Sequence, residues 1–437
     1  MKKTAMTKAA LLALATFGAS TAFAQSSLTI YGNIDVAVDN VHKGQGNVAG
    51  TTLAALAAAS PAFKAGFVDK STVTRLTSSV SSVNALGFRG TEDLGDGYKA
   101  NFVLEGQFQL DIGAQSGQDN RMWGRQAYVG LTTPGGEVRL GRQYAPMFFT
   151  FAFTTIEALG GADIQGSGLI VNNLQVRQDN QISYWLKTGG LTAALSYATN
   201  AGVDARVSST RGSAVTTTSG QIIGGLSAGN ETANSGNRGQ TFGLFVNYAF
   251  NPGFLVNGSY HSNKFGNAQL YTAGVGAWDN LDKYDAFAVG AKFTIPGADT
   301  ILSGIYHHGK FTNDAGDNEG AKINTFALGV KQPIGNFAVG AQFAYSKFSN
   351  FTEGKDTSLM LIGDYNFSKR TKLYIRAGYA KDEAGNTALT GTGLPVRGGP
   401  LPLLTGFGSL ETPFFSGGGA NIDATTRVVA VGIRHQF

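Results

Sequence analysis

The 437-residue sequence contains no cysteine, which excludes both a disulfide framework and a thiol nucleophile. Charged residues amount to only 14% of the chain, against roughly 25% in soluble domains. Proline is scarce, with 10 residues, whereas glycine (61), phenylalanine (29) and tyrosine (15) are abundant. Mean hydropathy is nevertheless close to zero, at -0.04. A chain with little charge and balanced hydropathy suits strands that present one face to lipid and the other to water.

Long hydrophobic runs are also missing. No segment reaches the roughly 18 apolar residues that a membrane-spanning helix requires. At the start of the chain, three lysines precede or flank a short apolar segment over residues 9–18, and Ala22-Phe23-Ala24 resembles a signal-peptidase site. We therefore expect residues 1–24 to be a cleaved signal peptide and residues 25–437 to form the exported protein, with an uncleaved anchor as the alternative.

The excess of basic residues is concentrated in that first segment. The whole chain has 34 basic and 29 acidic residues, for a formal net charge of +5. Removal of Lys2, Lys3 and Lys8 leaves 31 basic residues against 29 acidic ones, a net charge of +2. A net charge this small gives no reason to expect a nucleic-acid partner.

The dominant pattern in the rest of the chain is an alternation of apolar and polar side chains with a period of two. The alternation is clearest over residues 28–38, 102–110, 242–250, 337–345, 359–367 and 373–379. Because a β-strand places successive side chains on opposite faces, this pattern predicts strands with one apolar and one polar face.

Short and long connections alternate between these strands. Seven short turn signals occur at residues 93–97, 133–136, 188–190, 251–253, 296–299, 333–336 and 368–371. Longer stretches rich in Gly, Asn, Ser, Thr and Asp lie at residues 40–74, 111–120, 200–239, 313–321 and 380–425. Short turns at one end and long loops at the other are the signature of a transmembrane β-barrel.

The turns also give a strand count. Each of the seven short turns joins two strands, and the first (28–38) and last (426–437) strands must close on each other. The sequence therefore predicts an all-β fold, a transmembrane antiparallel 16-stranded β-barrel with no open edge. Sixteen strands enclose an aqueous lumen. The alternative is a soluble all-β protein whose apolar faces form an inner core.

One connection differs from the others in composition. Residues 141–185 carry four phenylalanines between Phe148 and Phe153, and then a glycine-rich bend at Gly160–Asp163. A disordered linker would not normally contain so many aromatic residues. We expect this segment to be a loop that folds back inside the hollow of the barrel, with its aromatic patch packed against the barrel wall.

Several segments resemble the Gram-negative general porins, most closely the betaproteobacterial and neisserial branch. They are Ser27–Asp35, Leu86–Gly95, Arg125–Leu131, Gly141-Arg142-Gln143, Arg177–Asn180 and Val431–Phe437. The resemblance implies a homotrimer of sixteen-stranded barrels in the outer membrane, in contact with membrane lipid and lipopolysaccharide. It implies that the loop after Gly141-Arg142-Gln143 folds into the lumen as a constriction loop. It also implies that the C-terminal Phe437 is presented to the barrel-assembly machinery.

Charged side chains are expected to line the constriction. By strand parity, Arg177 and Arg139 face the lumen, and Arg125 matches a wall arginine of the family by motif. Glu157, with Asp163 as a second candidate, is expected to provide the opposing carboxylate on the loop. Basic wall groups facing loop carboxylates would create a transverse field that selects among ions.

The sequence departs from the family pattern in two places. Ala85 stands where many members have arginine, and Ile156–Gly160 replaces a Pro-Glu-Phe-Gly stretch. Both changes remove charge or rigidity from the expected constriction.

Motifs of catalysis are absent from the sequence. It contains no nucleophile elbow, zinc-binding helix or phosphate-binding glycine loop, so we expect neither an enzyme nor a cofactor. The adjacent His307 and His308 would point to opposite faces of a strand, which argues against a shared metal ion.

These observations predict a passive diffusion channel for small hydrophilic solutes and ions, with a mild anion preference. Two alternatives remain. One is a solute-specific channel with a saturable binding track along Phe148–Phe153. The other is a surface barrel such as an adhesin, whose lumen is plugged.

Overall fold

The structure, a computed structural model, describes residues 26–46, 69–116, 121–156, 177–199, 240–272, 276–313, 322–349, 354–384 and 424–437. The expected signal peptide (1–24) lies outside them, as does the second half of the expected constriction loop.

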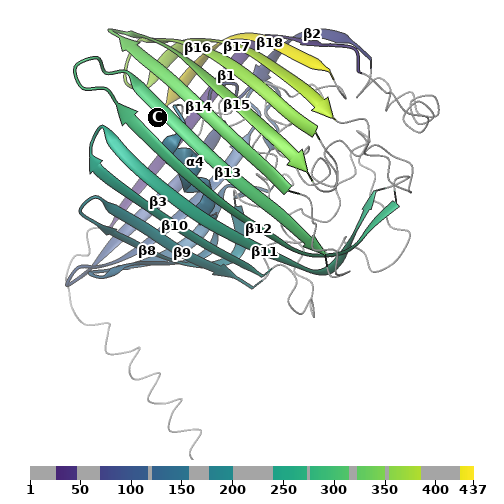
Figure 1. The fold of residues 1–437 in the computed structure, drawn as a ribbon. Helices are drawn as coiled ribbons and strands as arrows, with labels where there is room; N and C mark the ends of the chain where they lie inside the picture. Colours follow the sequence, from purple (N-terminus) through teal and green to yellow (C-terminus); the bar gives the residue numbers. More distant parts are fainter. Residues whose placement is uncertain are drawn as a thin grey trace, which may run out of the picture.

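The described residues form eighteen strand segments of one sheet and a helix (Figure 1). The elements are β1 (Ser27–Lys43), β2 (Ser71–Ser78), β3 (Ala85–Gly95), β4 (Tyr98–Phe108), β5 (Gln115–Ser116), β6 (Gln126–Thr133), β7 (Gly136–Tyr144), α4 (Pro146–Thr154), β8 (Arg177–Thr188), β9 (Leu191–Ala198), β10 (Thr241–Asn251), β11 (Phe254–Thr272), β12 (Gly276–Thr294), β13 (Ile301–Asn313), β14 (Lys322–Ile334), β15 (Phe337–Ser349), β16 (Gly354–Asn366), β17 (Thr371–Ala384) and β18 (Thr425–Gln436). Within the described ranges, no helix is both long enough and apolar enough to traverse a membrane.

The eighteen segments fill sixteen positions around the barrel. β2 and β3 lie end to end beside β1, because β3 pairs with residues 27–33 and β2 pairs with residues 36–43. The two-residue β5 likewise extends β6 alongside β4. All neighbouring strands are antiparallel, so the predicted antiparallel barrel of sixteen strands is confirmed.

The first and last strands close the barrel, as predicted. Residues 33–43 of β1 lie opposite residues 426–436 of β18. Beyond this ladder, the amide of Phe437 donates to the carbonyl of Gly32 and the amide of Gly32 donates to the carbonyl of Phe437, both at 3.1 Å. The seam is therefore hydrogen-bonded as far as the final residue of the chain. Such closure is necessary because lipid cannot satisfy an exposed backbone edge.

All seven predicted turns join neighbouring strands. They connect β3–β4, β6–β7, β8–β9, β10–β11, β12–β13, β14–β15 and β16–β17. At Gly189 and Gly335 the backbone φ is +54° and +59°, left-handed values that glycine adopts without strain. Consecutive antiparallel strands place these turns at one end of the barrel, which we call the turn end; the opposite end is the loop end.

Side chains alternate between the outer and inner faces of each strand. In β16, Leu361 is 52% exposed on the outside, whereas Met360 and Ile362 are buried inside. In β13, Leu302 faces outward and His307 is buried inside. The exposed apolar face is the one that lipid covers in an outer-membrane barrel.

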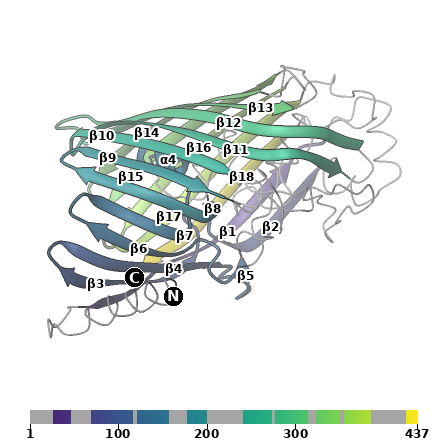
Figure 2. The ribbon, with the colours of Figure 1, turned by 90° about the horizontal axis from the view of Figure 1, so that it is seen from below.

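Helix α4 lies inside the barrel against the inner faces of β9 to β13 (Figure 1, Figure 2). The sequence predicted an in-barrel loop at this position but not a helix. Pro146 begins the helix, where its missing N–H removes no intrahelical hydrogen bond. Two polar contacts attach the helix to β11: Thr150 Oγ1 donates to Ser259 Oγ at 2.7 Å, and Asn257 Nδ2 donates to Thr154 Oγ1 at 2.9 Å.

The aromatic patch of residues 148–153 packs α4 against the barrel wall, as expected. The ring centroids of Phe149 and Phe153 lie 5.9 Å and 5.4 Å from that of Phe245, which is fully buried. Phe149 also meets Trp185 edge to face, at 4.8 Å. Each such pair contributes about 0.5–1.5 kcal/mol beyond the burial of apolar area.

Replacing Phe245 with alanine tests whether this packing holds α4. Deletion of a buried phenylalanine ring costs about 3–5 kcal/mol, so we expect Phe245→Ala to lower the temperature at which the barrel unfolds. The measurement is the heat-induced shift in electrophoretic mobility of the folded barrel. Phe326→Ala is the matched control because Phe326 is 51% exposed on the outer face. An equal effect of both substitutions would show that Phe245 does not anchor α4.

Candidate functional site

Two arginines meet on one tyrosine where β7 ends and α4 begins. Arg125 Nη2 donates to Tyr144 Oη at 2.6 Å, and Arg177 Nη2 donates to the same oxygen at 3.0 Å. The Arg177 guanidinium also lies over the Tyr144 ring, with its Cζ 4.6 Å from the ring centroid. Tyr144 in turn stacks on Phe148 of α4, at 4.4 Å and an interplanar angle of 12°. The packing of α4 therefore places the two guanidinium groups.

Among the described residues, one buried carboxylate accompanies these arginines. Glu105 of β4 accepts a hydrogen bond from Arg125 Nε through Oε1 and one from Tyr31 Oη through Oε2, the latter at 2.8 Å. We call Tyr31, Glu105, Arg125, Tyr144 and Arg177 the Tyr144 cluster. It has two guanidinium groups and one carboxylate. Because the pair of Arg125 and Glu105 is buried, loss of either partner would leave an uncompensated charge.

A second cluster lies beside the first, around Asp179 of β8. Arg121 Nη1 donates to both carboxylate oxygens at 2.9 Å, and Arg142 Nη1 donates to Oδ1. Arg142 Nε also donates to the carbonyl of Gly124 at 2.7 Å. The register of β7 and β8 shifts here, and Asn180 adopts a φ of +51°. This Asp179 cluster again has two guanidinium groups and one carboxylate.

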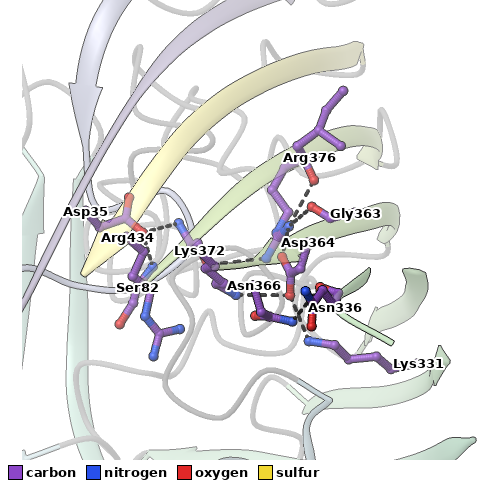
Figure 3. A network of polar contacts seen from close by, with 12 residues as sticks. Asp35, Ser82, Lys331, Asn336, Gly363, Asp364, Asn366, Lys372, Arg376 and Arg434 are labelled. Atoms are coloured by element: carbon purple, nitrogen blue, oxygen red, sulfur yellow. Dashed lines mark hydrogen bonds and ion pairs between the residues drawn. The ribbon is translucent and has the colours of Figure 1, made fainter. Parts of the chain in front are cut away.

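A third cluster surrounds Asp364 at the turn end of β16 (Figure 3). Asp364 Oδ2 accepts hydrogen bonds from Lys331 Nζ at 3.0 Å and from Lys372 Nζ at 3.1 Å. Asp364 Oδ1 accepts a hydrogen bond from Arg376 Nη1 at 2.9 Å. In this Asp364 cluster, three cations share one carboxylate. The Arg376 side chain is fully buried on the inner face of β17.

The break between β2 and β3 forms an inward segment, residues 79–84, that Asp35 holds in place. The Asp35 carboxylate accepts hydrogen bonds from the backbone amides of Val80, Ser81 and Ser82 at 3.0–3.1 Å. Tyr374 Oη donates to the same carboxylate at 2.6 Å. Four hydrogen bonds stabilise the buried Asp35 carboxylate in its charged form. The same bonds hold residues 79–84 in place, although this segment does not pair with a neighbouring strand.

The chain that leaves α4 reaches this same side of the lumen. Ile156 belongs to a buried apolar cluster with Val80 of the inward segment and with residues of β1 and β16–β18, including Met360 and Tyr374. α4 itself contacts β9 to β13. The first part of the constriction loop therefore extends from one wall of the barrel towards another.

The structure brings together two of the five residues that the sequence proposed for the constriction. Arg125 and Arg177 meet in the Tyr144 cluster. Arg139 lies apart from them on β7, where its Nη2 donates to Glu137 Oε2 at 2.7 Å. Glu157 and Asp163 lie outside the described residues.

Arg139 has an aromatic environment of its own. Its guanidinium Cζ lies 5.2 Å from the ring centroid of Tyr128 and 4.8 Å from that of Trp185. Trp185 also contacts Phe149 of α4. Arg139 thus packs among the aromatic side chains of the wall that contacts α4, and it is not part of the Tyr144 cluster.

Three carboxylates were missed by sequence reasoning: Glu105, Asp179 and Asp364. Strand parity could have placed Glu105 and Asp364 inside, because each alternates with outward apolar residues. No sequence signal identifies their partners, since Glu105 meets Arg125 and Tyr31 from other parts of the chain. Their contacts depend on which strands become neighbours and on the register in which those strands pair.

The aromatic patch does not form a lumen-facing track in the described structure. Phe148 and Phe151 are buried, and Phe149 and Phe153 are half-buried against the wall. The feature that motivated a solute-specific binding track is therefore used for packing.

Comparisons with known proteins agree with this architecture. The family model described as Gram-negative porin matches residues 9–385. Outer membrane porin protein 32 of Delftia acidovorans is 30% identical over 440 residues, covering 98% of this chain and 100% of that protein. An outer membrane porin protein of Bordetella pertussis is 29% identical over 451 residues, covering 100% of both chains.

A solved structure is similar over nearly the whole chain. An anion-selective porin from Comamonas acidovorans superposes with a TM-score of 0.63 at 26% identity, covering 94% of this chain and 100% of that chain. The fold of this chain is thus shared with a protein of related sequence. Together with the family match over most of the chain, these findings show that the protein belongs to the Gram-negative porin family and is a porin of the outer membrane.

Proposed function

We propose that this porin is a passive diffusion channel for small hydrophilic solutes and ions and that it favours anions. The observation that carries the proposal is the charge of the three wall clusters. Among the residues that the structure describes, cations outnumber carboxylates two to one in the Tyr144 cluster and in the Asp179 cluster, and three cations share the Asp364 carboxylate. The excess positive charge lowers the energy of an anion in the lumen and raises that of a cation.

The comparison with the anion-selective porin from Comamonas acidovorans supports the same sign of selectivity. That protein is 26% identical to this chain, and the match covers 94% of this chain. Passage through such a pore requires no bond to be made or broken. The channel accordingly needs only a lumen of fixed charge and suitable width, and we propose no enzymatic step.

Three expectations on partners remain predictions from the family resemblance. They are the homotrimer, the contact with lipopolysaccharide, and recognition of Phe437 by the barrel-assembly machinery. The Phe437 ring is 43% exposed while its backbone pairs with Gly32, so a receptor could contact the ring before the seam closes.

Arg177→Ala tests the Tyr144 cluster. Removal of one positive charge from the wall should lower the ratio of chloride to potassium permeability roughly twofold at an ionic strength of about 0.1 M, as expected for a charge within a Debye length (about 10 Å) of the passing ions. The measurement is the reversal potential of a planar bilayer in a KCl gradient. Arg427→Ala is the matched control, since Arg427 is exposed on the outer face of β18. Unchanged selectivity in Arg177→Ala would remove the cluster from the ion path.

Arg125→Ala is expected to lower the anion preference in the same way. It also leaves the buried Glu105 without its arginine, and loss of one partner of a buried ion pair costs about 3–5 kcal/mol. Arg125→Ala should therefore be less stable to heat than Arg177→Ala, as measured by the mobility shift of the folded barrel. Equal stability of the two variants would contradict the buried pairing.

Glu105→Gln tests the sign of the effect. The substitution removes the one negative charge of the Tyr144 cluster and keeps the shape and a hydrogen-bonding group, so the anion preference should rise, again roughly twofold. The reversal potential should move in the direction opposite to that of Arg177→Ala. A shift in the same direction in both variants would mean that the cluster acts through structure rather than charge.

Salt dependence separates a charged wall from a purely steric filter. The Debye length falls from about 10 Å at 0.1 M to about 3 Å at 1 M, so screening should weaken an anion preference that arises from fixed charges. Reversal potentials measured at the same KCl ratio and rising mean concentration should therefore approach the value for free diffusion. A preference that is independent of concentration would contradict the electrostatic origin.

A further inference from the structure

A series of basic side chains lies on the outer face of the barrel, near the loop end of the neighbouring strands β11 to β18 (Figure 1). Each of these strands has one lysine or arginine at a position that shares its face with outward apolar residues; Lys347, for example, shares the face of the exposed Phe343 and Val339. We call this set the basic belt, and its members are Lys264, Lys283, Lys310, Lys322, Lys347, Lys355, Lys381 and Arg427.

The strand register brings members of the belt together in pairs. Three pairs lie directly opposite each other on adjacent strands: Lys264 and Lys283, Lys310 and Lys322, and Lys347 and Lys355. Like charges at opposed positions of an antiparallel pair destabilise a sheet, so an anion beside them would be stabilising.

Acidic residues at the belt offset only part of its formal charge. Lys283 Nζ pairs with Asp285 Oδ2 at 2.6 Å, and Asp285 also lies opposite Lys310 in the register. Glu383 lies opposite Lys355. Eight basic residues against these two acidic ones give a formal charge of +6. An ammonium group has three hydrogen-bond donors, so a lysine that contacts a protein carboxylate can still donate to a second anion.

The belt lies just beyond an aromatic row that marks the edge of the apolar band. Tyr306, Phe326 and Tyr345 lie opposite one another on the outward faces of β13 to β15. Such aromatic girdles lie at the boundary between lipid and water. Lys347 and Lys322 are two and four residues further towards the loop end, which is about 7–14 Å at roughly 3.4 Å per residue. This distance places their ammonium groups in the layer of lipid headgroups.

The belt occupies one end of the barrel and part of its circumference. At the turn end of the same strands, outward positions carry apolar residues, among them Phe293, Leu302, Ile334, Phe337 and Ile433. At the loop end of β3, β9 and β10, the outward positions carry Leu86, Tyr197 and Phe242. The long loops of an outer-membrane barrel are extracellular, so the belt meets the outer leaflet.

We propose that the basic belt binds the phosphate groups of anionic lipid in the leaflet at the loop end. Basic residues beside a membrane surface attract anionic lipids, and lysine stems can lie on apolar surface while the charge reaches the headgroup. A soluble anion would contact the belt alone, whereas a lipid also covers the apolar face below it. The proposal assigns residues to the lipid contact that the family resemblance predicts. It does not rest on the anion preference of the pore, because the belt faces away from the lumen.

The test is electron spin resonance of the protein in phosphatidylcholine vesicles at about 0.1 M salt, where the Debye length is about 10 Å. Spin-labelled phosphatidic acid, whose headgroup is a phosphate monoester, is compared with spin-labelled phosphatidylcholine. The immobilised fraction of each label reports its association with the barrel surface. The unchanged protein should favour phosphatidic acid at least about twofold, and the double variant Lys322→Gln with Lys347→Gln should lose roughly half of that preference.

The matched control removes two lysines from the inner face. Lys187→Gln with Lys292→Gln changes the net charge equally, on inward positions of β8 and β12, and should leave the lipid preference unchanged. Each variant is first shown to form a conducting pore. If the belt variant does not, Lys264→Gln with Arg427→Gln, at the two ends of the belt, decides by the same comparison.

Three results would overturn the proposal. The unchanged protein shows no preference for phosphatidic acid, the belt variant and the control associate with it equally, or the belt variant alters the number of subunits while its lipid preference stays the same. The last result would mean that the belt contacts a second copy of this chain. Lipid association is measured outside the lumen, so its outcome is separable from that of the selectivity experiments.

Discussion

The structure depends on one constraint, which is that lipid offers no hydrogen bonds to a backbone. Every strand must therefore be paired on both sides, and the chain meets this requirement by closing β1 on β18. The closing ladder extends to the last residue, where the backbone of Phe437 pairs with Gly32. Once the barrel is closed, its inner faces form a wall that can support side chains in fixed positions.

The lumen is shaped by elements that leave this regular ladder. Helix α4 packs on β9 to β13, and the inward segment 79–84 is held by the Asp35 carboxylate near β16–β18. Ile156, just beyond α4, joins the apolar cluster of that second wall. The aromatic side chains of α4 pack against the barrel wall. The charged side chains form ion pairs between neighbouring strands of that wall.

The arrangement of charge is consistent among the three wall clusters. Within the described part of the chain, each places one carboxylate among a larger number of cations, and the carboxylate holds the arginine and lysine side chains in position. Buried ion pairs of this kind are weak evidence for stability, because desolvation offsets much of the attraction. Their more direct consequence is a rigid positive field along the lumen, which suits a channel that discriminates by charge.

The barrel could be predicted from the sequence because period-two alternation and short turns are local patterns, and the seven turns together with the first and last strands give sixteen strands. Parity also indicated which face of a strand meets water. The tertiary structure alone decided that residues 146–154 form a helix, and that Arg125 and Arg177 share Tyr144 while Arg139 pairs with Glu137. The physical reason is that a strand pattern tells which way a side chain points, whereas the order, register and stagger of the closed barrel determine what it meets there.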